Sequence, residues 1–386
     1  MAILTAGSLV PFDNLDYSFG FLEFITFTQR QSDLVRGDFR FLGVPEAGAD
    51  LFGQGFRYDS NGALTGGTVT GLRFTFFGET GFSLRELSVS VPRLTEIVFA
   101  GDDPGWAAIL NGSDLVVGSP FDDRLRGYAG DDRLMGGPGN DVLEGGGGVD
   151  RAVVTADGGP AELALFVWNG VAATVPVPGG TALAQGVDKL LGVEAVEYQR
   201  SDGSVIATAA IGADTFSPLQ YLASYGDLAD AFGTDQAAAF DHYVYAGIGE
   251  GRRPGFDATA YLAANTDVLA ALGPHATAAT LHYLAHGRFE GRAVSFDGLQ
   301  YIASHADLIS FFGPDAAAGT AHFVAAGFRE GRSPDSFDAA RYLANNPDLQ
   351  AVFGSDEAAA TRHFITFGFA EGRSDDPPAA PADFLL

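Results

Sequence analysis

The sequence of 386 residues predicts a multidomain α+β protein, and three observations support that fold class. Apolar and polar residues alternate with a period of two in much of the first hundred residues, which is typical of strands. A nine-residue repeat rich in glycine and aspartate follows, and a later repeat of 40 residues has helical spacing. At roughly 100–200 residues per domain, the chain can form two or three domains with separate cores.

The composition excludes several classes of protein. The chain has 22 Lys and Arg against 49 Asp and Glu, so its formal net charge is −27 and we expect no nucleic-acid partner. The absence of cysteine excludes disulfides, thiol nucleophiles and thiolate zinc sites. The sequence has no apolar run of the ~18–20 residues that a membrane span needs. Met1–Val10 contains no basic residue, so we expect no cleaved secretory signal peptide there.

Residues 1–107 are predicted to form a β-rich N-terminal module with a β-sandwich-like or jelly-roll-like architecture. Apolar residues alternate with polar ones over Leu72–Phe76 and again over Leu87–Val91. Between these runs, Gly78–Gly81 has the composition of a hairpin connection. The frequent phenylalanines are interpreted as a hydrophobic core rather than as a ligand site.

Residues 108–153 contain five nine-residue units that start at Ile109. Glycine allows the positive φ angles of a tight turn, and an aliphatic residue at the eighth position of each unit centres a short strand. Two units make one coil of 18 residues, so turns two units apart stack on the same edge. Each unit has aspartate at its sixth position, which places Asp123 near Asp141 on one edge and Asp114, Asp132 and Asp150 on the other. Such carboxylates, together with backbone carbonyls, form an oxygen cage that suits calcium better than magnesium.

These units resemble the RTX, or hemolysin-type, repeat Gly-Gly-x-Gly-x-Asp-x-aliphatic-x, which forms a parallel β-roll with calcium in its turns. The resemblance implies Ca²⁺ as the cofactor. It implies the following metal-binding residues: Asp114, Asp123, Asp132, Asp141, Asp150, Asn140, Gly118, Gly127, Gly136, Gly139 and Gly145. Ser119 and Tyr128 replace the second glycine, and Phe121 replaces the fourth, so we expect weaker binding in the outermost turns. A glycine-rich linker with solvated acids is the alternative, although linkers lack a fixed aliphatic period.

Residues 154–212 are predicted to be a β-rich extension of the roll, with strands over Ala161–Trp168, Val171–Val177 and Val193–Tyr198. Residues 213–375 contain four repeats of about 40 residues, which we expect to form an α-helical array. Each repeat should be two short helices that are split at a central glycine. The shared landmarks are an aromatic residue, an aspartate, this glycine, a histidine and a closing Glu-Gly-Arg. The histidines are His242, His282, His322 and His363, and we interpret them as structural.

Residues 376–386 form a tail in which Asp383 precedes Phe384–Leu386. This ending resembles the C-terminal signal of proteins exported by type I systems, the usual route of RTX proteins. The expected partners are therefore calcium and a type I ABC exporter, with cell-surface or matrix components as further candidates.

These observations favour a secreted, extracellular or cell-surface calcium-binding protein. Calcium should drive folding of the roll after export, since binding free energy becomes folding free energy. A surface, matrix or adhesion role without catalysis is expected, because the sequence has neither His-Glu-x-x-His nor Gly-x-Ser-x-Gly. The alternative is a secreted hydrolase with its active site in residues 1–107. The two catalytic carboxylates of such an enzyme need not follow any fixed spacing, so the sequence alone would not reveal them.

Overall fold

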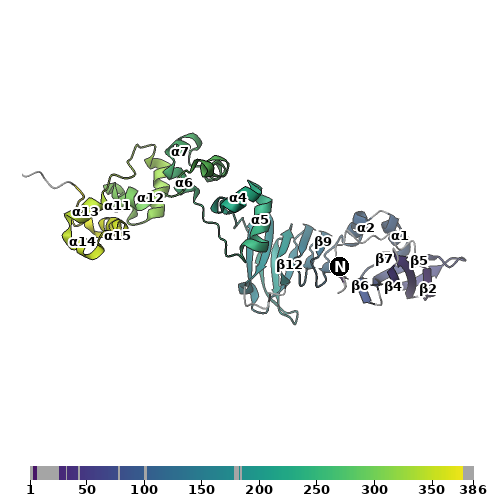
Figure 1. The fold of residues 1–386 in the computed structure, drawn as a ribbon. Helices are drawn as coiled ribbons and strands as arrows, with labels where there is room; N and C mark the ends of the chain where they lie inside the picture. Colours follow the sequence, from purple (N-terminus) through teal and green to yellow (C-terminus); the bar gives the residue numbers. More distant parts are fainter. Residues whose placement is uncertain are drawn as a thin grey trace, which may run out of the picture. The chain divides into compact units, whose positions relative to one another are not determined.

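The computed structural model describes residues 3–6, 26–31, 33–41, 44–76, 79–99, 102–177, 182 and 185–376 (Figure 1). The chain divides into two compact units. The first contains Met1–Phe216 and Val244–Ala246, and the second contains Ser217–Tyr243 and Gly247–Leu386. None of the described helices is long and apolar enough to cross a membrane.

The first unit starts with an antiparallel sheet. Its described strands are β1 (Ile3–Ala6), β2 (Thr26–Arg30), β3 (Leu34–Phe41), β4 (Val44–Tyr58), β5 (Leu64–Phe76), β6 (Glu79–Arg85) and β7 (Val89–Ser90). They are ordered β1-β6-β5-β4-β3-β2, and β7 pairs with β5. The buried Leu72 on β5 lies opposite Leu51 on one side and Leu84 on the other. The apolar side chains that the period-two pattern predicted to be buried therefore lie side by side on one face of this sheet.

Two helices follow, α1 (Val91–Phe99) and α2 (Asp102–Ile109), so the predicted β-rich module also contains helices that the alternating pattern did not indicate. The alternating run Leu87–Val91 gives only the short β7 before α1 begins. Pro92 lies in the first turn of α1, where the missing N–H has no intrahelical partner to lose. The α1 helix contacts β5, and the buried Trp106 of α2 lies against Phe82 with ring centroids 6.0 Å apart. In the described part of this module, the layer packed on the sheet is thus helical.

The nine-residue units form short parallel strands in two sheets, as predicted. These strands are β8 (Leu115–Val117), β9 (Arg124–Ala129), β10 (Arg133–Met135), β11 (Val142–Gly147) and β12 (Arg151–Thr155). β8, β10 and β12 pair in parallel in one sheet, while β9 and β11 pair in parallel in the other. The eighth-position side chains are fully buried between the sheets: Val116, Leu125, Leu134, Leu143 and Ala152. Each coil therefore adds one aliphatic side chain to each half of a continuous core.

The roll continues beyond the repeats. The 3₁₀ turn η2 (Gly159–Glu162) leads into a hairpin of β13 (Leu163–Trp168) and β14 (Val171–Pro176). β15 (Asp188–Leu191) then pairs in parallel with β11, β16 (Ala195–Gln199) pairs in parallel with β12, and β17 (Val205–Ala210) closes that sheet. At the other end, β1 pairs in parallel with β8, so the N-terminal sheet and one sheet of the roll are continuous.

The chain from Ser217 on contains four helical repeats, each of which has three short α-helices and a π-helical turn. They are α3 (Pro218–Ser224), α4 (Gly226–Phe232), α5 (Gln236–His242) and η4 (Tyr243–Gly247); α6 (Ala258–Ala264), α7 (Thr266–Leu272), α8 (Ala276–His282), η5 (Tyr283–Gly287) and the single turn α9 (Arg288–Glu290); α10 (Gly298–Ala303), α11 (Ala306–Phe312), α12 (Ala316–His322) and η6 (Phe323–Gly327); α13 (Ala339–Asn345), α14 (Pro347–Phe353), α15 (Glu357–His363) and η7 (Phe364–Gly368). The predicted break at the central glycine is present, for example at Gly233 with φ +60°. The prediction of two helices is wrong, because extended residues such as Tyr225 (φ −138°) split the first half again.

The landmark side chains of each repeat bind one another. Each repeat's tyrosine hydroxyl lies 2.8–3.0 Å from histidine Nδ1, in the pairs Tyr221–His242, Tyr261–His282, Tyr301–His322 and Tyr342–His363. The closing arginines pair with the landmark aspartates Asp227, Asp267, Asp307 and Asp348. These contacts are consistent with a structural role for the histidines, each of which binds a tyrosine of its own repeat.

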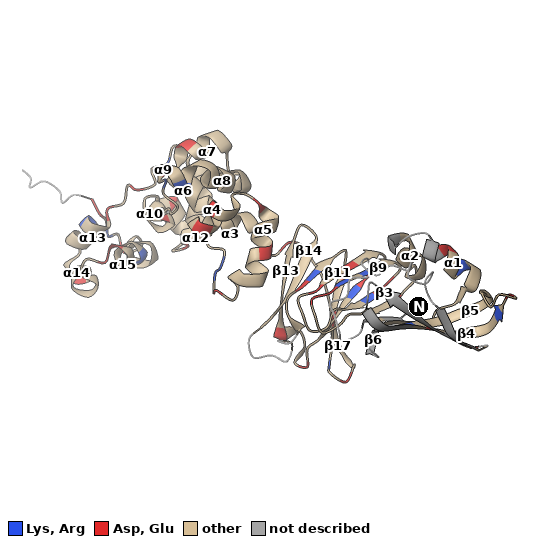
Figure 2. Cartoon of the chain, turned by 45° about the vertical axis from the view of Figure 1, so that its right-hand side comes forward, with Lys and Arg blue, Asp and Glu red and all other residues tan. Residues whose placement is uncertain are grey.

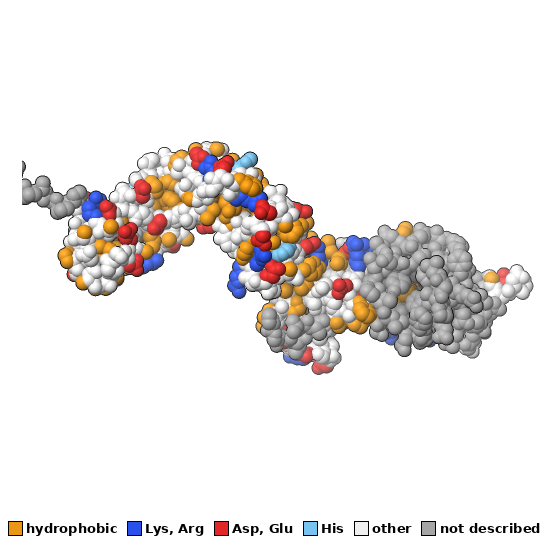
Figure 3. Space-filling view, viewed as in Figure 1, with side chains coloured by type: hydrophobic (Ala, Val, Ile, Leu, Met, Phe, Trp, Pro, Cys, Tyr) orange, Lys and Arg blue, Asp and Glu red, His pale blue; other side chains and the backbone are white. Residues whose placement is uncertain are grey.

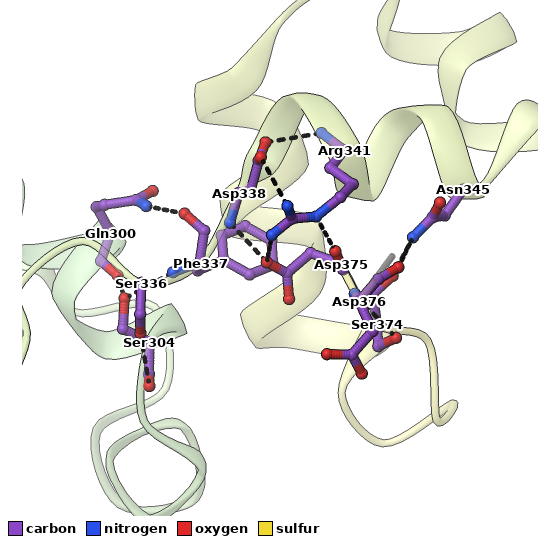
Figure 4. Close-up of polar contacts among 10 residues, drawn as sticks. All are labelled: Gln300, Ser304, Ser336, Phe337, Asp338, Arg341, Asn345, Ser374, Asp375 and Asp376. Atoms are coloured by element: carbon purple, nitrogen blue, oxygen red, sulfur yellow. Dashed lines mark hydrogen bonds and ion pairs between the residues drawn. The ribbon is translucent and has the colours of Figure 1, made fainter. Parts of the chain in front are cut away.

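Adjacent repeats meet through the first helix of one repeat and the segment that opens the next (Figure 4). Gln300 donates to the carbonyl of Phe337, and Ser304 Oγ accepts from the Phe337 N–H at 3.1 Å. In the fourth repeat, Arg341 and Asn345 take these two positions, and they bind Ser374–Asp376 instead. A charged contact therefore takes the place of the junction that joins the third repeat to the fourth.

Candidate metal centre

The repeat aspartates stack in two ladders, as the 18-residue coil predicted. On one edge, the Asp114 N–H donates to Asp132 Oδ1 and the Asp132 N–H donates to Asp150 Oδ1, both at 2.8 Å. On the other edge, the Asp123 N–H donates to Asp141 Oδ1, also at 2.8 Å. One oxygen of each receiving carboxylate is thus held by the backbone of the preceding coil.

The second oxygens of three aspartates are buried and have no partner. Asp132, Asp141 and Asp150 are fully buried, and their Oδ2 atoms accept no hydrogen bond from any described residue. A buried polar group without a partner costs about 1–3 kcal/mol, and more when it is charged. Burial raises the pKa of Asp132 and of Asp141 to about 7, and the neighbouring aspartates of each ladder add to the rise. Burial also raises the pKa of Asp150, so these groups lack the positive charge that their ionised forms need.

Glycine at the first position of each unit leaves room for these oxygens. A Cβ built on Gly127 would lie 2.3 Å from Asp132 Oδ2 and 2.6 Å from the Gly145 carbonyl of the next coil. A Cβ on Gly118 would meet the Gly136 carbonyl at 2.3 Å and Asp123 Oδ2 at 2.5 Å. Any side chain here would fill the space in which carboxylate and carbonyl oxygens converge. Added Cβ atoms on the first-position Gly136 and Gly145 would likewise meet an aspartate Oδ2, at 2.0 and 2.5 Å. A Cβ on Gly139, at the fourth position, would meet the Phe121 carbonyl oxygen at 2.6 Å and no carboxylate.

A further series of side chains, at the fifth position of the three middle units, accepts backbone N–H groups of the next coil. Asp122 Oδ1 accepts from the Asn140 N–H at 2.8 Å, and Asn140 Oδ1 accepts in turn from the Val187 N–H at 2.8 Å. Asn140 is exposed, and its amide oxygen is used by the backbone of the next coil. Its role as a metal ligand stays a prediction.

Ser119, which replaces the second glycine of its unit, changes the hydrogen bonding of Asp123 in the first turn on that edge. The Ser119 N–H donates to Asp123 Oδ2 at 2.5 Å, and Ser119 Oγ donates to Asp123 Oδ1 at 2.8 Å. Both oxygens of Asp123 therefore have protein donors, in contrast to Asp132, Asp141 and Asp150. This difference is in line with the expected weaker binding at that end of the roll.

Two ladder members lie outside the five units and were missed from the sequence. The Asp141 N–H donates to Asp188 Oδ1 at 3.2 Å, and the Asp150 N–H donates to Glu194 Oε2 at 2.7 Å. The signal was present, because Gly186, Asp188 and Leu190 keep the fourth, sixth and eighth positions of a unit. The intervening hairpin breaks the nine-residue register and hides it.

The donor set fits calcium. Within the described residues, no group of three or more His, Asp or Glu side chains could hold a metal ion, so an ion here needs backbone carbonyls as well. Aspartate oxygens alternating with glycine carbonyls supply an all-oxygen environment, which calcium prefers with 6–8 ligands. Asp132, Asp141 and Asp150 with the first-position glycines would hold the ion, which would supply the positive charge that the ladders lack.

Several charged residues on the strands of the roll form ion pairs. Glu144 on β11 binds Arg124 at 2.5 Å and also Arg126, both on β9, where acidic and basic segments lie side by side in Figure 2. These arginines hold the pKa of Glu144 below its usual value although burial opposes the shift. Glu144 is therefore neutralised by neighbours in its own sheet, unlike the ladder aspartates.

Comparison with known families agrees with this geometry. The family model of the RTX calcium-binding nonapeptide repeat matches residues 110–143 and 117–152. No curated protein sequence matches the chain. The match covers the units that carry both aspartate ladders, and residues 110–152 are RTX calcium-binding nonapeptide repeats.

Proposed function

We propose that the chain is a secreted calcium-binding protein whose β-roll folds when it meets calcium outside the cell. RTX repeats are typical of secreted bacterial proteins. The observation that carries the proposal is the set of buried, unpartnered carboxylate oxygens on Asp132, Asp141 and Asp150.

The energetics favour coupled binding and folding. Three such oxygens at about 1–3 kcal/mol each cost the calcium-free roll about 3–9 kcal/mol, which is comparable to the whole stability of a domain. Calcium removes that cost and adds its own binding free energy to folding. Free calcium is scarce in the cytosol and abundant outside, so the roll would stay loose before export and become ordered after it.

Export by a type I system is part of the proposal, with Phe384–Leu386 as the recognised residues. These residues lie outside the described part of the structure. Deletion of Phe384–Leu386 should leave the protein inside cells that carry the exporter, whereas removal of an equal length from an internal loop should not. Normal secretion of the truncated chain would refute this assignment.

The helical array is proposed to act as a non-catalytic surface or matrix component. The pairings of Tyr with His and of Arg with Asp occur in all four repeats, as expected for scaffold and not for one active site. Exposed apolar side chains differ between repeats and include Phe289, Phe311 and Val352, at 69%, 81% and 74% exposure. In Figure 3, hydrophobic side chains are spread over the array among acidic ones, which supports a role in contacts.

Calcium titration of the purified chain tests the central claim. Far-ultraviolet circular dichroism should gain β signal as calcium rises from chelator to millimolar concentrations, and calorimetry should show a higher melting temperature. Asp132→Asn and Asp141→Asn should weaken the response, whereas Asp202→Asn, in an exposed turn of the same unit, should not. An unchanged spectrum and melting temperature in the parent chain would exclude calcium-coupled folding.

A further inference from the structure

We infer that the calcium-binding stack continues past the matched repeats, and that Asp188 and Glu194 close two further calcium sites together with Asp141 and Asp150. The inference rests on the proposed function, because it extends the same site. It adds ligands from residues that the repeat family does not cover, on the far side of the β13–β14 hairpin.

The backbone around Asp188 repeats the geometry of a nonapeptide turn. Within the repeats, the residue after a ladder aspartate donates to the carbonyl of the preceding one, as Val142 N–H does to Asp123 O at 2.8 Å. Lys189 N–H donates to Asp141 O at 2.7 Å in the same way. Asp188 is only 2% exposed, and its Oδ1 receives the Asp141 N–H. The Asp141–Asp188 step is therefore built like the Asp123–Asp141 step.

The backbone around Glu194 does the same on the other edge. The N–H groups of Glu194 and Ala195 both donate to Asp150 O, at 3.1 and 3.3 Å. A Cβ built on Gly145 would lie 2.5 Å from Asp150 Oδ2 and 2.1 Å from the Gly192 carbonyl. This arrangement copies that at Gly127, where Asp132 Oδ2 and the Gly145 carbonyl converge. A carbonyl from outside the repeats thus completes the oxygen set around Asp150.

An independent feature points to an ion at both steps. Asp141 and Asp150 are the last repeat members of their ladders, and both have a fully buried Oδ2 without a partner among the described residues. Asp132, in the middle of the repeats, has the same unpartnered oxygen. If the stack ended at the last repeat, these two buried oxygens would face no ligand. Because the three aspartates have the same geometry, we infer that each of them binds an ion between its own turn and the next turn on the same edge.

The use of glutamate in place of aspartate follows from the shorter turn. Ladder positions on the two edges are nine residues apart in the repeats, but Asp188 and Glu194 are only six apart. Glutamate has one more methylene than aspartate, so its carboxylate can reach the Asp150 N–H from a shortened turn. The stack then has three steps between repeat aspartates (114/132, 132/150 and 123/141) and two that need the added acids (141/188 and 150/194).

Counting bound calcium tests the inference. Asp188→Asn and Glu194→Gln keep an oxygen that accepts the ladder N–H but remove the charge. By native mass spectrometry and calorimetry in millimolar calcium, each variant should bind one ion fewer than the parent, and the double variant two fewer. Glu197→Gln is the matched control, since Glu197 lies on β16 and pairs with Arg133 outside the ladders. It should bind as many ions as the parent.

An undiminished ion count in both variants would overturn the inference while leaving the proposed function intact. A parent chain that binds no calcium would instead refute the proposed function. Hydrogen exchange of the parent chain gives a second measurement that needs no variant. Peptides covering residues 186–199 should gain protection over the same calcium range as those covering 110–152. Protection of 186–199 that is independent of calcium would also contradict the inference.

Discussion

The space beside Gly136 gives the sharpest test of the calcium cage, because a second repeat glycine provides a matched control. A Cβ on Gly136 would lie 2.0 Å from Asp141 Oδ2, with Cγ at 2.6 Å and the Asp141 Cβ at 2.8 Å. A Cβ on Gly112 would meet no atom within 4 Å. Neither glycine has a positive φ, so alanine strains neither backbone and the two substitutions differ only in the space available.

The size of the effect follows from the overlap. Non-bonded contacts to carbon have an optimum near 3.5 Å, so in Gly136→Ala the carboxylate of Asp141 must move by more than about 1 Å. Overpacking of this kind costs about 1–3 kcal/mol. If the whole cost appears in calcium-coupled folding, the apparent calcium Kd of the affected steps rises about 5- to 150-fold. For a unit of 150–250 residues, each kcal/mol lowers the Tm by about 2–4 °C.

The assay is calcium titration by calorimetry, with melting curves in excess calcium. Gly136→Ala should bind calcium more weakly and melt at a lower temperature, whereas Gly112→Ala should behave like the parent chain. Two results would refute the reasoning. One is parent-like titration of Gly136→Ala, and the other is equal damage from Gly112→Ala, since that would attribute the effect to alanine in any turn.

Three further predictions concern other parts of the chain. The pKa values of Asp132 and Asp141 are raised from 3.8 to about 7, so the folded calcium-free roll binds more protons than the unfolded chain between these pH values. The stability of the calcium-free roll should therefore rise as the pH falls from about 7 toward 4. Equal melting temperatures in chelator at pH 5 and pH 8 would contradict this. Tyr261→Phe removes the hydroxyl that binds His282 and should cost about 1 kcal/mol in chemical denaturation, whereas Tyr283→Phe should be neutral, because Phe323 and Phe364 occupy that position in later repeats. Asp375→Ala removes the carboxylate that accepts from the Asp338 N–H and pairs with Arg341, while the backbone contacts of Ser374–Asp376 stay. The segment should become more sensitive to protease while the melting temperature of the array changes little, and unchanged resistance would show that the carboxylate does not hold the segment.

The sequence predicts the geometry of the repeats well, because the nine-residue period alone determines the coil. A nine-residue unit with one buried aliphatic side chain fixes the coil, and the coil places Asp123 over Asp141 and Asp132 between Asp114 and Asp150. The glycine caps and the four-fold array follow in the same way, since each repeat supplies its own signals.

Features that depend on contacts distant in sequence were not predicted. Glu194 joins a ladder across an insertion, and no period survives such a change of register. The partner of each repeat histidine is a tyrosine 21 residues earlier, and only the packing of two helices brings them together. Leu87–Val91 has the alternation of a strand, but the chain becomes helical at Val91. Val91 and Leu94 are both buried on one side of α1, so the packing of that helix, and not the local alternation, determines the structure from Val91 on.

The pairing of β1 with β8 makes the N-terminal sheet depend on the roll. Ile3–Ala6 are more than 100 residues from their parallel partner, and they form the only described link between β6 and the roll within that sheet. A contact this distant in sequence forms late, after its template exists. If calcium orders β8, then β1, which binds no ion, can pair with β8 only when calcium is present. Calcium then controls the assembly of the N-terminal sheet as well as that of the roll.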